Sequence, residues 1–154
     1  MAAHEKFKKP LIVVVNKYDV WKKLAPSMNL EKISPYKILG GREYLDFSVI
    51  QKVSKRVEKL LKTISPEMIS ACKTFCSDIT YIPVSPIGGS PEVASSDLLG
   101  VRPKNIRPIW AEVPLLYAIA KSKCKLVPAA TEKSRFENPN SSSNGDLMAP
   151  RTNQ

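Results

Sequence analysis

The chain has 154 residues, which is the length of one domain with a core of its own. Its hydrophobic fraction of 43% and charged fraction of 25% are those of an ordinary soluble globular protein. A single histidine and three cysteines without paired spacing argue against a His-containing zinc site or a Ser-His-Asp triad. The start of the chain has no apolar signal-peptide core, and no apolar run reaches membrane-spanning length, so we expect a reduced, cytoplasmic protein.

The first predicted element is a strand at Leu11–Val15, a continuous apolar and β-branched run typical of a parallel strand buried on both faces. The next stretch, Val20–Glu43, mixes proline, a Gly-Gly pair and polar residues, and we expect a loop there with a short helix near Val20–Leu24. Asp46 is suited to cap a helix, and apolar residues then recur at three- and four-residue steps. The sequence therefore predicts an amphipathic helix at Phe47–Ile64 with basic residues on its outer side.

Ser65-Pro66-Glu67 begins a second predicted helix, with a cap, a proline in the first turn and an acid near the positive helix end. Asp78–Val84 (DITYIPV) is a second predicted strand. Pro83 has no N–H to donate, so this strand lies at an edge or ends there. A last helix is predicted at Ile109–Lys121, where Pro114 either kinks it or marks its first turn.

The predicted order is strand, loop, helix, helix, strand, loop, helix. Two parallel strands joined through helices form a right-handed crossover unit, and a sheet of only two strands is marginal by itself. We therefore expect an α/β fold, a partial three-layer unit with a short parallel sheet flanked by helices. Residues 1–121 form this α/β domain, and residues 122–154, which are polar, form a disordered C-terminal tail.

Asn16-Lys17-Tyr18-Asp19 follows the first predicted strand directly. A carboxylate there can accept hydrogen bonds from guanine N1–H and N2–H together, a bidentate contact that adenine cannot make. The stem of Lys17 can lie over the base plane, and the amide of Asn16 can tie the surrounding loops together. The carboxyl end of a parallel strand is also where open α/β sheets bind ligands. A surface turn after a strand is the alternative interpretation.

This segment resembles the NKxD motif of Ras-like and translation-factor-like P-loop GTPases. The resemblance covers about Lys9–Lys121, the C-terminal half of such a domain, and implies a P-loop NTPase-like fold. It implies that Asn16 braces the guanine site, Lys17 stacks on the base and Asp19 pairs with the guanine edge.

In the same family, the next parallel strand ends in a Ser-Ala segment whose backbone amide contacts guanine O6. Here Asp78–Val84 is followed by Ser85-Pro86-Ile87. Pro86 stands where the family has alanine and cannot donate. The resemblance therefore implies that Ser85 and Ile87 border the base, with either Ile87 supplying the amide or guanine recognition weakened.

The sequence contains no glycine-rich Gly-Lys-Ser or Gly-Lys-Thr segment and no Asp-x-x-Gly switch segment. We expect the family's first half to lie before Met1. GTP or GDP is the expected ligand, whereas Mg²⁺ would need the P-loop half. The chain is thus predicted to be a GTPase-like, guanine-nucleotide-binding domain fragment that does not hydrolyse GTP by itself.

Two other functions fit the sequence. One is a non-catalytic interaction or scaffold protein, in which a protein partner covers the exposed sheet edge. The other is a basic nucleic-acid-binding module, suggested by the net charge of +10 and the basic face of the Lys52–Lys62 stretch. The expected partners are a weakly bound guanine nucleotide, a protein at the sheet edge and nucleic acid.

Overall fold

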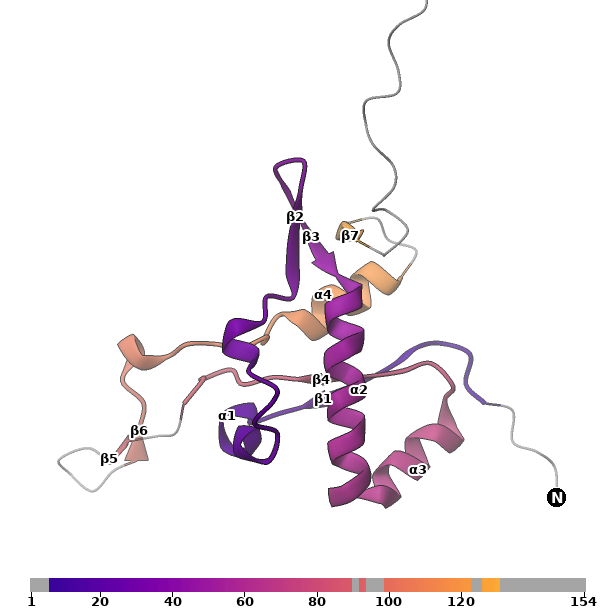
Figure 1. Ribbon diagram of the computed structural model, residues 1–154, viewed down its shortest axis with the longest axis horizontal. Coiled ribbons are helices and arrows are strands. Elements are labelled where there is room, and N and C mark those ends of the chain that lie inside the picture. Colours follow the sequence, from indigo (N-terminus) through magenta and orange to yellow (C-terminus); the bar gives the residue numbers. More distant parts are fainter. Residues whose placement is uncertain (1–5, 90–91, 94–98, 123–125, 131–154) are drawn as a thin grey trace, which may run out of the picture.

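The computed structural model describes residues 6–89, 92–93, 99–122 and 126–130. Its central sheet has two parallel strands, β1 (Leu11–Val15) and β4 (Ile79–Pro83), paired residue for residue. In Figure 1 the two strands lie side by side and the long helix α2 (Phe47–Ile64) runs across them. The prediction of a small parallel sheet flanked by helices is confirmed.

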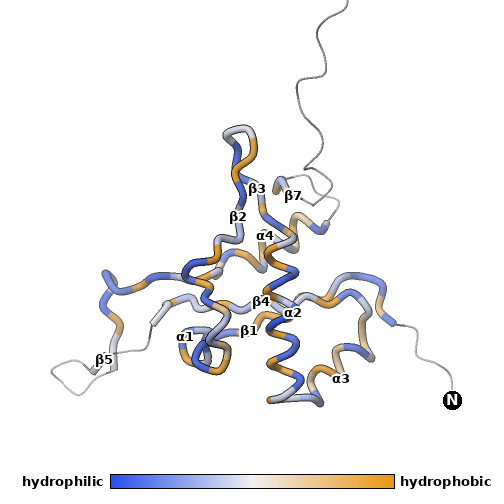
Figure 2. Tube along the Cα trace, in the orientation of Figure 1, coloured by the Kyte–Doolittle hydropathy of each residue, from blue (hydrophilic) through white to orange (hydrophobic). Residues whose placement is uncertain are grey.

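Helix α2 has the predicted bounds because its N-terminus is capped. The Asp46 carboxylate accepts hydrogen bonds from the N–H groups of Ser48 and Val49, at 2.9 and 3.2 Å. Its buried stripe consists of Ile50, Val53, Ser54 and Val57. Figure 2 shows hydrophobic and hydrophilic residues alternating along the helix, as expected for one that packs on one side only.

Helix α3 (Pro66–Phe75) follows α2 immediately, and α4 (Val113–Lys121) is the last helix in the described part of the chain. Ser65 occupies the cap position of α3, but its side chain makes no capping hydrogen bond. Helix α4 begins four residues later than predicted, and Pro114 lies in its first turn, where a missing N–H costs nothing. The short helix α1 (Tyr18–Trp21) follows β1. Single 3-10 turns occur at Lys22–Leu24, Leu30–Lys32 and Pro103–Asn105.

The expected short helix near Val20–Leu24 corresponds to the end of α1 and the 3-10 turn after it, but the prediction of a loop over the rest of Val20–Glu43 is wrong at its end. Strands β2 (Tyr36–Leu39) and β3 (Arg42–Asp46) form an antiparallel hairpin that projects from the body of the molecule in Figure 1. Gly40 and Gly41 both have positive φ, 56° and 75°, which is the conformation that a two-residue hairpin turn requires.

Strand β7 (Ala129–Ala130) pairs in parallel with the end of β3, and Ala130 is buried. The sequence assigns these residues to the polar tail, so described structure continues beyond Lys121. The rest of that tail, residues 131–154, lies outside the described residues. The two-residue strands β5 (Glu92–Val93) and β6 (Leu99–Gly100) pair antiparallel in the connection between β4 and α4.

The prediction that Leu11–Val15 is buried on both faces is wrong. Val14 is 50% exposed and the other four residues of β1 are half-buried, whereas Tyr81 and Ile82 of β4 are 2% and 0% exposed. Strand β4 is buried mainly because α2 packs against it, and Tyr117 of α4 contacts its Thr80. The Gln51 side-chain amide of α2 donates to Thr80 of β4 at 3.2 Å and to Tyr117 of α4 at 2.7 Å. No helix among the described residues is long and apolar enough to cross a membrane.

Candidate functional site

The carboxyl ends of β1 and β4 lie next to each other because the two strands are parallel and in register. The loops that follow them enclose a small pocket of about 190 Å³. All five residues predicted to bind guanine line this pocket, together with Val20, Pro86 and Gly89; the five are Asn16, Lys17, Asp19, Ser85 and Ile87. Residues about 70 positions apart in the sequence thus meet in one place.

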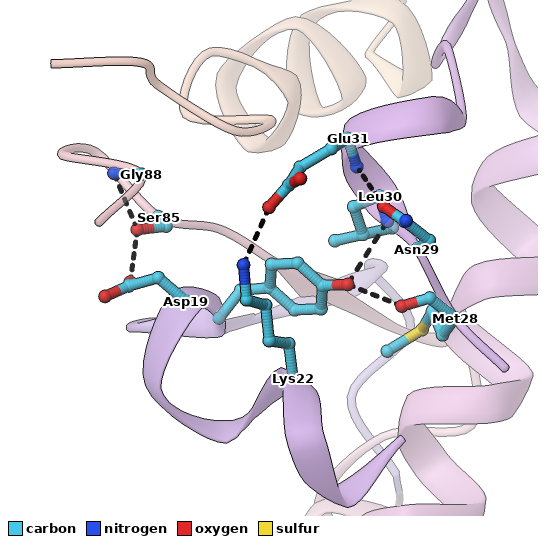
Figure 3. A network of polar contacts seen from close by, with 9 residues as sticks. Asp19, Lys22, Met28, Asn29, Leu30, Glu31, Ser85 and Gly88 are labelled. Atoms are coloured by element: carbon cyan, nitrogen blue, oxygen red, sulfur yellow. Dashed lines mark hydrogen bonds and ion pairs between the residues drawn. The ribbon is translucent and has the colours of Figure 1, made fainter. Parts of the chain in front are cut away.

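One side-chain contact joins the two loops. The Ser85 hydroxyl donates to Oδ1 of Asp19, and the same hydroxyl oxygen accepts a hydrogen bond from the Gly88 N–H at 3.0 Å (Figure 3). Ser85 is buried, and Asp19 is half-buried. Ser85 therefore fixes the carboxylate and its own loop, and the Asp19 carboxylate is held at the pocket with its second oxygen directed away from Ser85 in Figure 3.

The loop after β4 is held by a close backbone contact. Gly88 has a φ of +78°, and a Cβ placed on it would lie 1.8 Å from the carbonyl oxygen of Arg107. The Arg107 N–H donates to the Ile87 carbonyl at 2.9 Å, and Ser85 and Ile109 exchange two backbone hydrogen bonds. Sequence reasoning missed Gly88 as a site residue, although a Gly-Gly pair beginning four residues after the predicted strand end was the available signal.

The loop after β1 contains an uncommon backbone conformation. Lys17 has a φ of 57°, in the left-handed region that non-glycine residues rarely occupy. The Asn16 side chain supports this turn, since its Oδ1 accepts from the Lys17 N–H at 2.7 Å. The Asn16 side chain thus bonds within its own loop, while the contact that ties the two loops together is that of Asp19 with Ser85. Such strained residues tend to cluster at binding sites.

Tyr18 anchors the site to the core, a role that the sequence analysis did not assign. It is 1% exposed, and its N–H donates to the Val84 carbonyl at 3.0 Å. Its hydroxyl donates to the Met28 carbonyl at 2.5 Å and accepts from the Leu30 N–H at 3.2 Å (Figure 3). An aromatic residue directly after an apolar strand was the signal for it. Because Tyr18 points inward, its neighbours Lys17 and Asp19 lie at the surface.

Trp21 closes the same turn from outside. Its indole N–H donates to the Asn16 carbonyl at 2.9 Å, and its ring meets that of Tyr18 edge to face. Lys22, one residue on, pairs with Glu31 at 2.9 Å, and the hydrogen bond and charge of Glu31 raise the pKa of this lysine. Among the described residues, Lys17 is the only lysine that lines the pocket.

Within the described part of the chain, no three His, Cys, Asp or Glu side chains are grouped closely enough to hold a metal ion. Comparisons with protein-family models, with curated protein sequences and with solved structures found no match to this chain. The assignment of a function therefore depends on the pocket itself.

Proposed function

We propose that this chain is a GTPase-like module whose pocket binds the base of a guanine nucleotide. The observation that carries the proposal is the convergence of Asn16, Lys17, Asp19, Ser85 and Ile87 on one pocket at the carboxyl ends of two parallel strands. A binding site at that end of the strands is the general expectation for open α/β sheets.

The chemistry of the lining supports a guanine base. The Asp19 carboxylate would accept from N1–H and N2–H, and such bonds to an ionised acceptor are strong. Adenine offers no matching pair of donors, so the carboxylate would lose its hydration without compensation. Lys17, which is exposed, would lay its aliphatic stem on the base.

Ile87 would supply the donor for guanine O6. Pro86 has no N–H, and the Gly88 N–H is already bonded to Ser85. Among the described residues, the Ile87 N–H has no hydrogen-bond partner, although its carbonyl accepts from Arg107. Ile87 itself is 40% exposed and lines the pocket. Of the two possibilities that Pro86 leaves open, this geometry favours Ile87 as the donor.

The size of the pocket supports binding of the base alone and not of a whole nucleotide. Its volume of about 190 Å³ is below the roughly 300–1,000 Å³ of pockets that enclose a whole ligand. A base of about 11 non-hydrogen atoms at about 0.3–0.5 kcal/mol per atom gives a dissociation constant on the order of 1 mM. The proposal is confined to weak recognition of the base and includes no hydrolysis.

Saturation-transfer difference NMR, which detects millimolar binders, tests the proposal with GMP and AMP. We expect a base-proton signal for GMP at least several times that for AMP. Asp19→Asn keeps an acceptor for Ser85 but removes the charge and one acceptor, so GMP binding should fall about tenfold or more. Asp78→Asn is the matched control, because Asp78 lies beyond the opposite end of β4 and pairs with Lys121. Equal signals for GMP and AMP, or no signal for either, would refute the proposal.

A second candidate function rests on a separate observation. The outer face of α2 exposes five cationic side chains: Lys52, Lys55, Arg56, Lys59 and Lys62. Of these, Lys62 pairs with Glu58 at 3.2 Å, and the described residues offer no acid to Lys52, Lys55 or Lys59. Such a face could bind nucleic acid by phosphate contacts. Binding to a 20-nucleotide RNA that weakens steeply with added salt, and is lost in Lys52→Ser/Lys55→Ser/Lys59→Ser, would support this function.

A further inference from the structure

The loop after β4, which forms one wall of the pocket, has a different neighbour on each side. The Val84 carbonyl accepts a hydrogen bond from the N–H of Tyr18, at the start of α1, at 3.0 Å. Ser85, the next residue, exchanges two backbone hydrogen bonds with Ile109, at 2.8 and 2.9 Å. Because successive residues of an extended chain face opposite neighbours, this wall lies between the loop after β1 and the segment that leads to Ile109.

Exposed cationic side chains stand on both sides of this wall. On the β1 side, Lys17 lines the pocket, and Lys23 follows the pocket-lining Val20 by about one helical turn. On the side that faces away from β1, Arg107 donates its N–H to the loop after β4 at 2.9 Å, and Lys104 occupies the 3-10 turn just before it. Both groups lie at the end of the molecule where β1 and β4 terminate (Figure 1).

These four cations have no acid partner among the described residues. Lys22, which precedes Lys23, differs from them because it is paired with Glu31 (Figure 3). The carboxylate of Asp19, in the pocket lining, is already bonded to Ser85. The positive charge around the pocket is therefore available to an anionic ligand, and its distribution over two sides indicates more than one anionic group.

We propose that the guanine bound here belongs to a single-stranded nucleic acid, whose phosphates on the two sides of that nucleotide contact the two groups of cations. The inference rests on the proposed guanine site and names its ligand class. Free GMP carries one phosphate, on the 5′ side of its sugar, whereas a nucleotide within a strand has one on each side. The pocket would select the base, and the cations would supply the sequence-independent share of the affinity.

The test is an anisotropy titration of fluorescein-labelled RNA oligomers UUUGUUU and UUUAUUU with the full chain, with GMP as an unlabelled competitor. We expect UUUGUUU to bind at least about tenfold more tightly than GMP and at least about fivefold more tightly than UUUAUUU. Two phosphate contacts also predict a roughly sevenfold loss of affinity between 50 and 200 mM salt. The DNA forms are measured in parallel, and tighter binding than GMP by either form supports the proposal and identifies the sugar.

Two double variants locate the phosphate contacts. Lys23→Ser/Lys104→Ser removes one cation from each side of the pocket and should weaken UUUGUUU binding about tenfold. Its GMP signal in saturation-transfer difference NMR should stay unchanged, because neither residue lines the pocket. Lys52→Ser/Lys55→Ser is the matched control, since it removes two cations from the outer face of α2, and binding of this short oligomer should not change.

Several outcomes would overturn the proposal. These are equal binding of UUUGUUU and UUUAUUU, an affinity no higher than that of GMP, or a loss of binding in the Lys52→Ser/Lys55→Ser control in place of Lys23→Ser/Lys104→Ser. Failure of the guanine site itself gives a different result, namely equal NMR signals for GMP and AMP. A preference for GMP over AMP, together with an oligomer that binds no more tightly than GMP, refutes only the strand and leaves the guanine site in place.

Discussion

Strands β1 and β4 lie side by side in the same sheet, yet the strand with the more apolar sequence is the more exposed one. LIVVV in β1 has a side chain at 50% exposure, while ITYIP in β4, with a threonine, a tyrosine and a proline, has four buried residues. The difference arises because the long helix α2 packs on β4, where its Ser54 and Gln51 satisfy polar groups of that strand. The hydropathy of a strand's sequence thus indicates which side chains could be buried. The helices and strands packed against it determine which of them are buried.

The largest expected effect on stability comes from comparing a side-chain truncation in β4 with one in β1. Ile82→Ala should lower the free energy of unfolding by about 2–5 kcal/mol, because the side chain is fully buried and its loss leaves a cavity. Val14→Ala should cost less than about 1 kcal/mol, since half of this side chain is already in water. Urea denaturation followed by circular dichroism measures both. Similar losses for the two variants would mean that β1 is as buried as β4.

The loop after β4 should be nearly as sensitive. Gly88→Ala forces a non-glycine residue to positive φ and a Cβ into the Arg107 carbonyl, for a combined cost of about 2–4 kcal/mol. Gly89→Ala is the matched control, because a Cβ there meets nothing within 4 Å. Thermal unfolding should show a clearly lower melting temperature for Gly88→Ala than for Gly89→Ala. An unchanged Gly88→Ala protein would show that this loop is not held against Arg107.

A smaller effect is expected at the edge of β4. Ser54→Ala leaves the Tyr81 N–H buried without a partner, which costs about 1–3 kcal/mol. Ser70→Ala, on the exposed side of α3, should change the free energy of unfolding by less than about 0.5 kcal/mol. Hydrogen exchange of the Tyr81 amide should also quicken in Ser54→Ala. If Ser54→Ala changes neither the free energy of unfolding nor the exchange of the Tyr81 amide, the hydrogen bond from Tyr81 to Ser54 does not protect this edge of β4.

The smallest effect concerns the cap of the helix that covers β4. Asp46→Ala should cost about 1 kcal/mol at neutral pH. Partial burial opposes ionisation of Asp46, but hydrogen bonds from Ser48 and Val49 outweigh it and lower its pKa below the usual 3.8. Its contribution is therefore complete above about pH 5 and is lost as the pH falls through the lower folded-state pKa. Denaturation at pH 7 and at pH 3 should show the variant's deficit shrinking at the lower pH.

Local signals in the sequence were sufficient for several elements. The cap at Asp46 and the three- and four-residue apolar spacing located α2 correctly. The hairpin Tyr36–Asp46 was missed although its Gly-Gly pair separates two short runs by the two residues that a tight turn needs, because the runs are too polar to stand out. Pairing of Ala129–Ala130 with β3 had no local signal, since it depends on contact across more than 80 residues.

The sequence by itself determined five of the eight residues that line the pocket. Asn16, Lys17 and Asp19 follow one strand and Ser85 and Ile87 the next, and parallel strands bring their carboxyl ends together whatever surrounds them. Only the tertiary structure decided how that wall is held and how far each strand is buried. The bond of Ser85 to Asp19 and the contact of Gly88 with Arg107 depend on exact loop paths. The exposure of β1 depends on where the helices pack, because the elements packed against a strand, and not its own residues, determine how far it is buried.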